Sequence, residues 1–300
     1  MIILYWNSLN ENLKKEYGCK VYKLSLSTGC SCPNRDGENK RGCIFCDGAG
    51  AFAAAGTIDE QIKQAKERVS KKIKGEVKYI SYFQSFTNTF EKPEYLRPLF
   101  IDAMKPEDVV ALSIATRPDC LGDDILKLLD ECNKIKPVWV ELGLQTIHEE
   151  SAKYIRRGYS LKTFDKAVKD LKALGITVIV HQILGLPNET QEQMVETSRY
   201  IGRSGADGIK LHLLHVLKKT DLAAEWEKGR VKTLSMDEYI NVLEKCIENL
   251  PREIVIHRLT GDGAKKDLIA PLWSADKKRV LNSIHKAFED DDVEQGRLYY

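Results

Sequence analysis

The sequence of 300 residues lacks any apolar run that approaches the roughly 18 residues of a membrane-spanning helix. Its first residues also lack the basic start and the small-residue cleavage site of a secretory signal peptide. We therefore expect a soluble cytoplasmic protein with no membrane partner. The formal net charge is only +2, so the overall charge favours no class of partner. With 43% hydrophobic residues, a chain of this length can bury one large α/β core or two small ones.

Several signatures of common enzymes are absent as well. The sequence has no P-loop, no HExxH motif and no Ser-His-Asp order, so it gives no support to phosphoryl transfer or to hydrolysis. No glycine-rich fingerprint follows the first predicted strand, which argues against a dinucleotide-binding sheet. Eight cysteines would make a poor disulfide framework in a chain of this size, and they favour a reducing compartment instead.

The most informative feature is the run CPNRDGENKRGCIFC, which contains Cys32, Cys43 and Cys46. Gly37 and Gly42 allow the tight turns that bring separated cysteines together. Three thiolates can hold a four-iron cluster and leave one iron open to bind a cofactor. A closed zinc site usually needs four ligands in two close pairs, and only one well-spaced pair is present. The spacing therefore favours a [4Fe-4S] cluster, with structural zinc and inert cysteines as the alternatives.

The other cysteines offer no second metal site. Cys30 could pair with Cys32, but their C-x-C spacing is tighter than that of most zinc pairs. We expect Cys30, Cys120, Cys132 and Cys246 to behave as small buried hydrophobic residues. Because these cysteines are scattered along the chain, we expect neither an auxiliary cluster nor sulfur insertion from one.

Short β-rich segments recur at intervals of roughly 30 residues, each followed by a helical pattern, which is the alternation of a parallel sheet with outer helices. The predicted strands are residues 21–26, 77–83, 109–115, 138–144, 176–184 and 209–216. A further strand, 253–257, follows a predicted helix near 236–250. The pattern predicts an α/β fold, an incomplete TIM-like (βα)6 barrel, with a doubly wound open sheet as the alternative.

This fold divides the chain into three parts. Residues 1–20 form an N-terminal extension, and residues 21–217 form the partial barrel, with the cysteine loop at 30–47. Residues 218–300 form a C-terminal α/β extension that closes the barrel.

Polar residues follow the predicted strands, where parallel barrels carry their chemistry. In the segment VWVELGLQT, the alternation of a strand sends Glu141 and Gln145 to one face, which we assign to the barrel interior. A buried glutamate needs an ammonium, a guanidinium or a ligand hydroxyl as its partner. An internal salt bridge to Arg117 or Lys210 is the structural alternative to a role in binding. The histidines in or near strands are, one by one, most often structural.

Taken together, the motifs resemble the radical S-adenosylmethionine superfamily. In particular, they are similar to the branch of the catalytic subunit of elongator and to the small YhcC/YtqA-type proteins. The resemblance covers most of the chain, about residues 22–263. The motifs that carry it, in order, are CPNRDG with CIFC, YFQSFTNT, TRPDC, ELGLQT, RRGYS, HQILGLP and KLHLLHVLKKTDLA.

The resemblance implies an enzyme with a [4Fe-4S] cluster and S-adenosyl-L-methionine, which is cleaved reductively to a 5′-deoxyadenosyl radical that takes hydrogen from a substrate. One departure is Ala115, which stands where the elongator subunit has an acid. Residues carried over are Gln84, Thr87 and Asn88 for the methionyl end of the cofactor, Gln145 and Arg157 for its carboxylate or ribose side, and Glu141, His181 and Lys210 as pocket lining.

The resemblance to elongator also implies a tRNA substrate, modified at the C5 side group of the wobble uridine. It further implies an electron donor such as a flavodoxin or ferredoxin, and no seat for acetyl-coenzyme A is evident. Two basic groups could contact RNA, although lysine-rich helix faces are usually only solvated, and the acidic segment EDDDVE would repel RNA. These groups are Lys63, Lys66, Arg68, Lys71, Lys72 and Lys74, and Lys265, Lys266, Lys277, Lys278 and Arg279.

Two other functions remain open. The first is a radical enzyme that acts on a small metabolite or a tetrapyrrole, as relatives resembling the oxygen-independent coproporphyrinogen oxidase do. The second is a non-catalytic RNA-binding module that carries a metal. Cofactor cleavage separates this module from both enzymes, and tRNA binding separates the two enzymes from each other.

Overall fold

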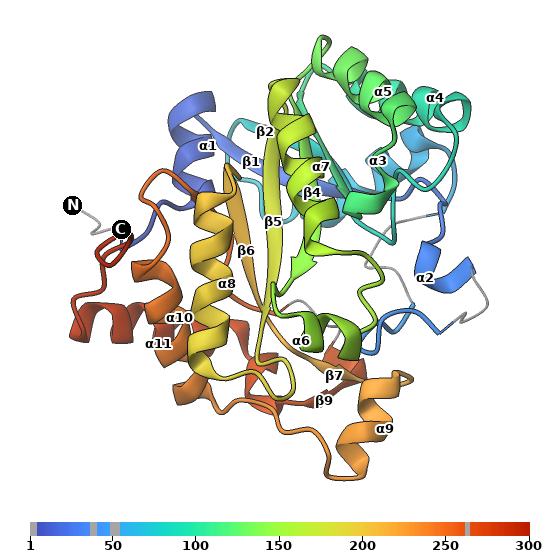
Figure 1. Cartoon of the computed structure of the whole chain (residues 1–300). Coiled ribbons are helices and arrows are strands. Elements are labelled where there is room, and N and C mark those ends of the chain that lie inside the picture. Colours follow the sequence, from blue (N-terminus) through green and yellow to red (C-terminus); the bar gives the residue numbers. More distant parts are fainter. Residues whose placement is uncertain (1–4, 37–40, 49–54, 262–264) are drawn as a thin grey trace.

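The computed structural model describes residues 5–36, 41–48, 55–261 and 265–300. Its centre is a curled sheet of seven parallel strands, a half-barrel with the order β1-β2-β3-β4-β5-β6-β8 (Figure 1). The predicted incomplete TIM-like barrel is therefore confirmed. The strands are β1 (Lys20–Leu26), β2 (Val77–Phe83), β3 (Val109–Thr116), β4 (Val138–Gln145), β5 (Thr177–Leu184), β6 (Gly208–Leu213) and β8 (Val255–Arg258). Of the predicted segments, residues 1–4 of the N-terminal extension and 37–40 of the cysteine loop, Gly37 included, lie outside the described residues.

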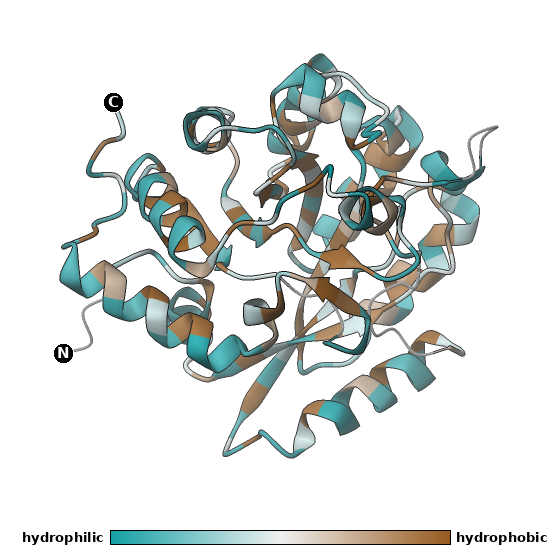
Figure 2. Ribbon diagram, turned by 90° about the horizontal axis from the view of Figure 1, so that it is seen from below, coloured by the Kyte–Doolittle hydropathy of each residue, from teal (hydrophilic) through white to brown (hydrophobic). Residues whose placement is uncertain are grey.

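Helices cover the convex face of the sheet, and they turn their hydrophobic residues toward it (Figure 2). Local sequence signals fix where several of them begin: Thr57, Thr190 and Ser235 each form a capping box with the residue three positions later. None of the described helices is long and apolar enough to cross a membrane. The outer helices are α3 (Ile58–Ser70), α4 (Pro93–Met104), α5 (Asp123–Asn133), α7 (Leu161–Ala173), α8 (Gln191–Arg203) and α10 (Met236–Glu248).

The sheet has one strand more than the six that the sequence predicts for the barrel. The segment assigned to the C-terminal extension, now β8, pairs in parallel with β6 and continues the same sheet. The predicted strand at 209–216 is also shorter, because β6 ends at Leu213. The residues after it form β7 (Val216–Leu217), which pairs antiparallel with β9 (Leu268–Ala270).

The first helix, α1 (Leu9–Tyr17), closes the amino-terminal end of the half-barrel. It packs against both β1 and β8, the two edge strands of the sheet, and Ser8 forms a parallel bridge with Ile256. Leu13 is buried in one hydrophobic group with the inward-facing Ile80, Trp139 and Ile179. Part of the segment that the sequence analysis treated as an N-terminal extension therefore fills the amino-terminal end of the barrel interior. We call this part, α1, the plug.

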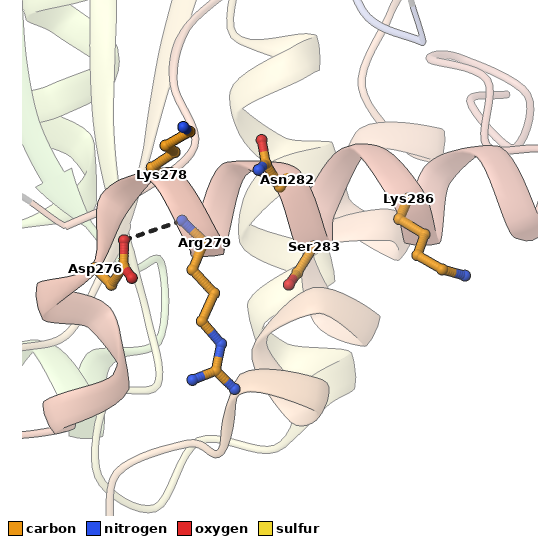
Figure 3. A pocket seen from close by; sticks show the side chains of 6 residues that line it. All are labelled: Asp276, Lys278, Arg279, Asn282, Ser283 and Lys286. Atoms are coloured by element: carbon orange, nitrogen blue, oxygen red, sulfur yellow. Dashed lines mark hydrogen bonds between the residues drawn. The ribbon is translucent and has the colours of Figure 1, made fainter.

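Shorter elements complete the fold around the carboxyl ends of the strands. They are α2 (Pro33–Asp36), α6 (Glu149–Tyr154), α9 (Asp221–Glu227) and the 3-10 helices Pro118–Cys120, Lys265–Asp267 and Leu272–Ala275. The last helix, α11 (Lys277–Asp290), is capped by Asp276, whose carboxylate accepts a hydrogen bond from the Arg279 backbone N–H at 3.1 Å. Beside it lies an open hollow of about 390 Å³ (Figure 3). This hollow is lined by Asp276, Lys278, Arg279, Asn282, Ser283 and Lys286.

Alternate residues of a strand face the helices and the barrel interior, and the helix-facing set forms the main hydrophobic core. Leu142 of β4 is fully buried in this core. We expect Leu142→Ala to lower the free energy of unfolding by about 2 to 5 kcal/mol, because it removes buried methyl groups and leaves a cavity. Leu272→Ala is the matched control, since Leu272 is 70% exposed, and it should change stability by less than about 0.5 kcal/mol. Urea unfolding of the apoprotein measures both, and equal losses would contradict the assignment of this face to the core.

Candidate functional site

A cavity of about 660 Å³ lies at the carboxyl ends of the strands, where parallel barrels place their sites. All of the site residues predicted from the sequence, except Asn88, line it. They come from the loop after β1, from the segment after β2, from the strands β4, β5 and β6, and from the segment after α6, so the fold joins segments that are far apart in the sequence. The predicted residues in its wall are Cys32, Cys43, Cys46, Gln84, Thr87, Glu141, Gln145, Arg157, His181 and Lys210.

The three cysteines are half-buried at one side of this cavity and form no disulfide. Cys32 precedes α2 and accepts the first backbone hydrogen bonds of that helix. In the described part of the chain, no three His, Cys, Asp or Glu side chains are placed to hold one metal ion together. A four-iron cluster makes a different demand, because each thiolate binds its own iron atom. Cys30, in contrast, belongs to the hydrophobic core and does not line the cavity.

Two neighbouring side chains donate hydrogen bonds to cysteine sulfurs. Asn34 Nδ2 lies 3.2 Å from Cys43 Sγ, and Arg35 Nη2 lies 3.2 Å from Cys46 Sγ. Burial raises the pKa of the Cys43 thiol to about 11, the hydrogen bond from Asn34 lowers this pKa, and the nearby Cys46 and Cys32 raise it. A bound cation or cluster would reverse this balance in favour of the thiolate.

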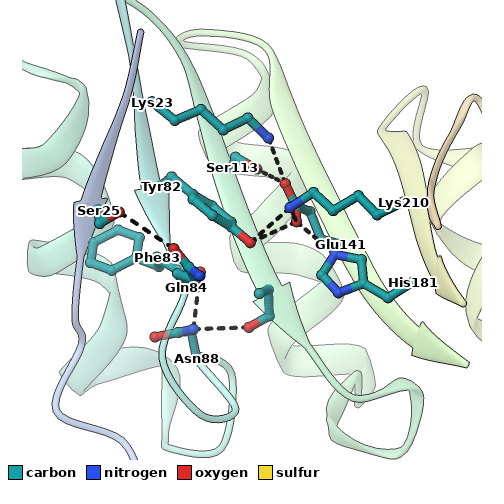
Figure 4. Close-up of polar contacts among 11 residues, drawn as sticks. Lys23, Ser25, Tyr82, Phe83, Gln84, Asn88, Ser113, Glu141, His181 and Lys210 are labelled. Carbon is teal, nitrogen blue, oxygen red and sulfur yellow. Dashed lines mark hydrogen bonds and ion pairs between the residues drawn. The ribbon is translucent and has the colours of Figure 1, made fainter. Parts of the chain in front are cut away.

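The floor of the cavity is an ion cluster around Glu141, which is 1% exposed. Lys23 Nζ of β1 lies 2.7 Å from Glu141 Oε1, and Lys210 Nζ of β6 pairs with Glu141 Oε2 (Figure 4). The predicted alternative of a salt bridge to Lys210 is therefore present. Arg117, the other predicted partner, pairs instead with Asp119 at 2.7 Å.

Uncharged side chains from the strands between these two lysines complete the shell of the carboxylate. The Tyr82 hydroxyl of β2 donates to Glu141 Oε2 at 2.8 Å, and the Ser113 hydroxyl of β3 donates to Oε1 at 2.9 Å. His181 Nε2 of β5 lies 2.8 Å from Oε2. Together with the lysines, they make one contact to Glu141 from each of the strands β1, β2, β3, β5 and β6.

The charges in this cluster follow from burial and from two cations that share one carboxylate. Burial would raise the pKa of Glu141, but Lys210 and then Lys23 outweigh it and hold that pKa well below its usual range. Burial lowers the pKa of Lys210 to about 7, against the attraction of Glu141. Burial, with Lys210 next, lowers the pKa of His181 to about 4. Glu141 is thus ionised at neutral pH, and the neutral His181 ring donates to it from Nε2.

The other predicted residues occupy the wall above this floor. Gln145 has a positive φ of 68° at the irregularity where β4 and β5 shift register. A Cβ atom on Gly143 would lie 2.9 Å from Gln145 Nε2, so the glycine leaves room for this amide. Arg157 is 2% exposed and donates from Nη1 to the Thr146 carbonyl at 2.6 Å. Its Nη2 is buried, lies 3.9 Å from Glu149 Oε2, and has no hydrogen-bond partner among the described residues.

Asn88 is the predicted residue that does not line the cavity. It is fully buried, and its Nδ2 donates to the carbonyls of Ala115 at 2.9 Å and Phe83 at 3.1 Å. Asn88 therefore braces the ends of β2 and β3 from behind the wall, and a contact of its side chain with a cofactor stays a prediction. Ala115 does line the cavity.

Two wall residues that the sequence analysis did not assign to the site, Tyr159 and His212, have unused hydrogen-bonding capacity; the strand histidines, His212 included, were interpreted one by one as structural. The Tyr159 ring lies 5.2 Å from the Arg117 guanidinium and 4.9 Å from that of Arg157, and no described residue forms a hydrogen bond with its buried hydroxyl. His212 Nε2 is also buried and has no hydrogen-bond partner within residues 5–36, 41–48, 55–261 and 265–300, and burial, with His181 next, holds the pKa of His212 well below its usual range. Tyr159 is the fourth residue of the motif RRGYS, and His212 lies in β6 two positions after Lys210, so strand periodicity places His212 on the same face as Lys210.

The two predicted basic groups have different places in the fold. Lys71, Lys72 and Lys74 follow α3 just before β2 begins, at the amino edge of the sheet and away from the cavity. Lys66 of the same group is paired with Asp108 at 2.6 Å. In the second group, Lys266 lines the cavity, whereas Lys278 and Arg279 line the separate hollow beside α11.

Comparisons with known proteins agree with this geometry. Residues 27–201 match the Radical SAM superfamily, and residues 206–290 match the Radical SAM C-terminal domain. The protein YtqA of Bacillus subtilis (strain 168) is 42% identical over 299 residues, which cover 98% of this chain and 92% of that protein. The tRNA uridine(34) acetyltransferase of Methanocaldococcus jannaschii is 29% identical over 156 residues, which are 51% of this chain and 28% of that protein.

A solved structure supports the fold. The structure of Methanocaldococcus infernus Elp3 with an N-terminal deletion superimposes with a TM-score of 0.72 over 92% of this chain and 64% of that chain. Sequence identity in this superposition is 20%, so the likeness concerns the fold.

From the ion cluster we predict that removing the charge of Glu141 strongly lowers the free energy of unfolding. Glu141→Gln would leave Lys23 and Lys210 facing each other without a carboxylate, and we expect it to lower the free energy of unfolding of the apoprotein by about 3 to 5 kcal/mol. Glu131→Gln is the matched control, because Glu131 pairs with Arg97 on the surface and its side chain is 48% exposed. This control should cost at most about 1 kcal/mol. Urea unfolding at pH 7 measures the free energy of unfolding of both variants. A similar small decrease in both would contradict the conclusion that Glu141 stabilises the barrel.

Proposed function

This chain belongs to the radical SAM superfamily, and from that premise we propose that it is a tRNA-modifying enzyme acting at the C5 side group of the wobble uridine. It works with a [4Fe-4S] cluster and S-adenosylmethionine, and it receives electrons from a donor such as a flavodoxin or ferredoxin in the cytoplasm. The observation that carries the proposal is a single cavity at the strand ends that brings the three cysteines together with the polar wall residues.

The residues present fit these two groups. Cys32, Cys43 and Cys46 would hold three irons, and the fourth iron would be free to bind the cofactor. The buried Arg157 Nη2 and Tyr159 hydroxyl offer donors that an oxygen-bearing ligand in the cavity would satisfy. When bound, the pair supplies one-electron cleavage of a sulfonium and a carbon radical that takes hydrogen from the substrate.

The protein contributes position and the exclusion of water. We assign Gln84 and Thr87 to the methionyl end of the cofactor, and Gln145 and Arg157 to its carboxylate or ribose. The fixed wall would hold the target C–H bond beside the reacting carbon, which lowers the entropic part of the barrier. An enclosed site also protects a reactive radical from side reactions.

Support for tRNA comes from the similarity to the tRNA uridine(34) acetyltransferase, which covers about half of this chain. Further support comes from exposed lysines at the mouth of the cavity. Lys218 Nζ donates to the Lys266 carbonyl at 2.7 Å, so these two lysines and their neighbours Lys219 and Lys265 form one basic rim. Such a rim can neutralise phosphates while an anticodon base enters the cavity.

Cluster assembly tests the metal assignment. We expect anaerobic reconstitution to give one four-iron cluster per chain, and alanine at Cys32, Cys43 or Cys46 to abolish both the cluster and the cleavage of S-adenosylmethionine. Cys30→Ala is the matched control, since Cys30 lies in the core, and it should keep both. Iron and sulfide analysis gives the cluster content. Retention of the cluster by Cys32→Ala together with its loss in Cys30→Ala would show that the ligands are assigned wrongly.

Binding at several salt concentrations tests the substrate. Replacing the rim residues Lys218, Lys219, Lys265 and Lys266 by Gln should weaken tRNA binding and flatten its salt dependence, by up to about 0.9 in log–log slope for each lost phosphate contact. The matched control replaces Lys63, Lys71, Lys72 and Lys74 of the α3 group. If only this second variant loses affinity, tRNA is held by the α3 group and not by the rim.

Nucleosides from a deletion strain complete the test of the substrate. Mass spectrometry of tRNA from that strain should show an altered wobble uridine compared with the parent strain. No tRNA binding and unaltered nucleosides, with intact cofactor cleavage, would favour a small-molecule substrate. Absence of cleavage with a loaded cluster would favour a non-catalytic RNA-binding module.

A further inference from the structure

Two consecutive residues of α2 place hydrogen-bond donors on the sulfurs of two predicted iron ligands. Asn34 Nδ2 lies 3.2 Å from Cys43 Sγ. Arg35 Nη2 lies 3.2 Å from Cys46 Sγ and 2.9 Å from the Cys46 carbonyl oxygen. One donor is a neutral amide and the other a guanidinium, so the second also brings a full positive charge to the sulfur.

Arg35 occupies a space that two glycines leave open. A Cβ atom on Gly42 would lie 3.0 Å from Arg35 Nη2, and one on Gly48 would lie 2.7 Å from Arg35 Cζ. Both glycines also have a positive φ, 72° and 68°, which other residues rarely adopt. The loop is therefore shaped around the guanidinium of the half-buried Arg35, which is held against Cys46.

Asn34 is held in a similar way. Its Nδ2 also donates to the Arg156 carbonyl at 2.6 Å, and a Cβ atom on Gly158 would lie 2.7 Å from its Oδ1. The segment after α6 thus fixes the direction of this amide. Both donors are positioned before any ligand binds.

We propose that Arg35 and Asn34 raise the reduction potential of the cluster, an inference that rests on the proposed function. Reduction adds one electron to the oxidised cluster, with no bond broken and no proton taken up. The electron comes from a low-potential one-electron donor of the flavodoxin or ferredoxin class. Hydrogen bonds to the sulfurs and a nearby positive charge stabilise the more negative, reduced form. Arg35 has the larger effect because its bond is charge-assisted.

The test is a redox titration of the reconstituted protein, followed by the electron paramagnetic resonance signal of the reduced cluster, without S-adenosylmethionine or substrate. Arg35→Met keeps the length of the side chain but removes its donors and its charge. We expect a shift to lower potential by at least a factor of ten in the equilibrium constant, which is about 59 mV for a one-electron couple. Asn34→Leu should shift the potential in the same direction by less.

The matched control is Arg41→Met, in the same loop. Arg41 is 70% exposed and lies 3.6 Å from Asp221, so it is a cation of this loop that faces solvent. Its replacement should leave the potential unchanged. If Arg35 were only structural, Arg35→Met would lower the iron content while the remaining clusters kept the parent potential.

Each outcome separates the inference from the function on which it rests. A normal iron content in Arg35→Met with the parent potential would overturn the inference and leave the proposed function intact. If Arg35→Met holds no cluster, the same measurement is made on Arg35→Gln, which keeps a donor without the charge. A normal iron content with the parent potential in Arg35→Gln would then overturn the inference. A parent protein that assembles no cluster would overturn the proposed function, and the inference with it.

Discussion

The half-barrel depends on one carboxylate. Glu141 of β4 contacts side chains from β1, β2, β3, β5 and β6, so a single buried charge joins six neighbouring strands at one level of the barrel. A carboxylate without partners would be very costly at this depth, and so would either lysine alone. The mutual satisfaction of these groups favours one register of the strands, because a slip by one residue would turn each of them to the other face. Below this level, α1 fills the interior with apolar side chains, and above it the cavity opens.

The floor and the upper wall of the cavity differ in how much hydrogen-bonding capacity they have left for a ligand. Glu141 accepts from Lys23 and Ser113 on one oxygen and from Tyr82, His181 and Lys210 on the other, which uses the roughly four lone-pair sites of a carboxylate. A ligand that bound Glu141 directly would have to displace one of these donors. In contrast, three buried polar atoms of the wall, Arg157 Nη2, the Tyr159 hydroxyl and His212 Nε2, have no hydrogen-bond partner in the described part of the chain. The floor is therefore best suited to hold the strands in place, and the upper wall to bind ligands.

The sequence predicted much of this arrangement, and its failures have physical causes. Strand periodicity placed Glu141 inside the barrel and named Lys210 as a partner, because both lie in strongly patterned buried strands. It did not find Lys23, since a lysine in an edge strand usually faces solvent.

The plug was missed although Leu9, Leu13 and Tyr17 recur at helical spacing, because nothing local shows what a short helix covers. The strand β8 was predicted, but its pairing with β6 depends on contacts far apart in the chain. The positive φ of Gln145 has no local signal in a residue other than glycine or asparagine.

The cysteine loop is fastened to the barrel by bonds that do not involve the ion cluster. The Ile44 backbone N–H donates to the Ile155 carbonyl at 3.3 Å, and the Leu222 N–H donates to the Ile44 carbonyl at 2.9 Å. Arg156 Nη1 pairs with Asp221 at 2.6 Å, which ties the segment after α6 to α9. The loop is thus anchored to the end of α6 and to α9, and Asn34 joins the same set through the Arg156 carbonyl. The cysteine loop and the strands are therefore held by two separate sets of contacts, the backbone and side-chain bonds of the loop and the ion cluster around Glu141.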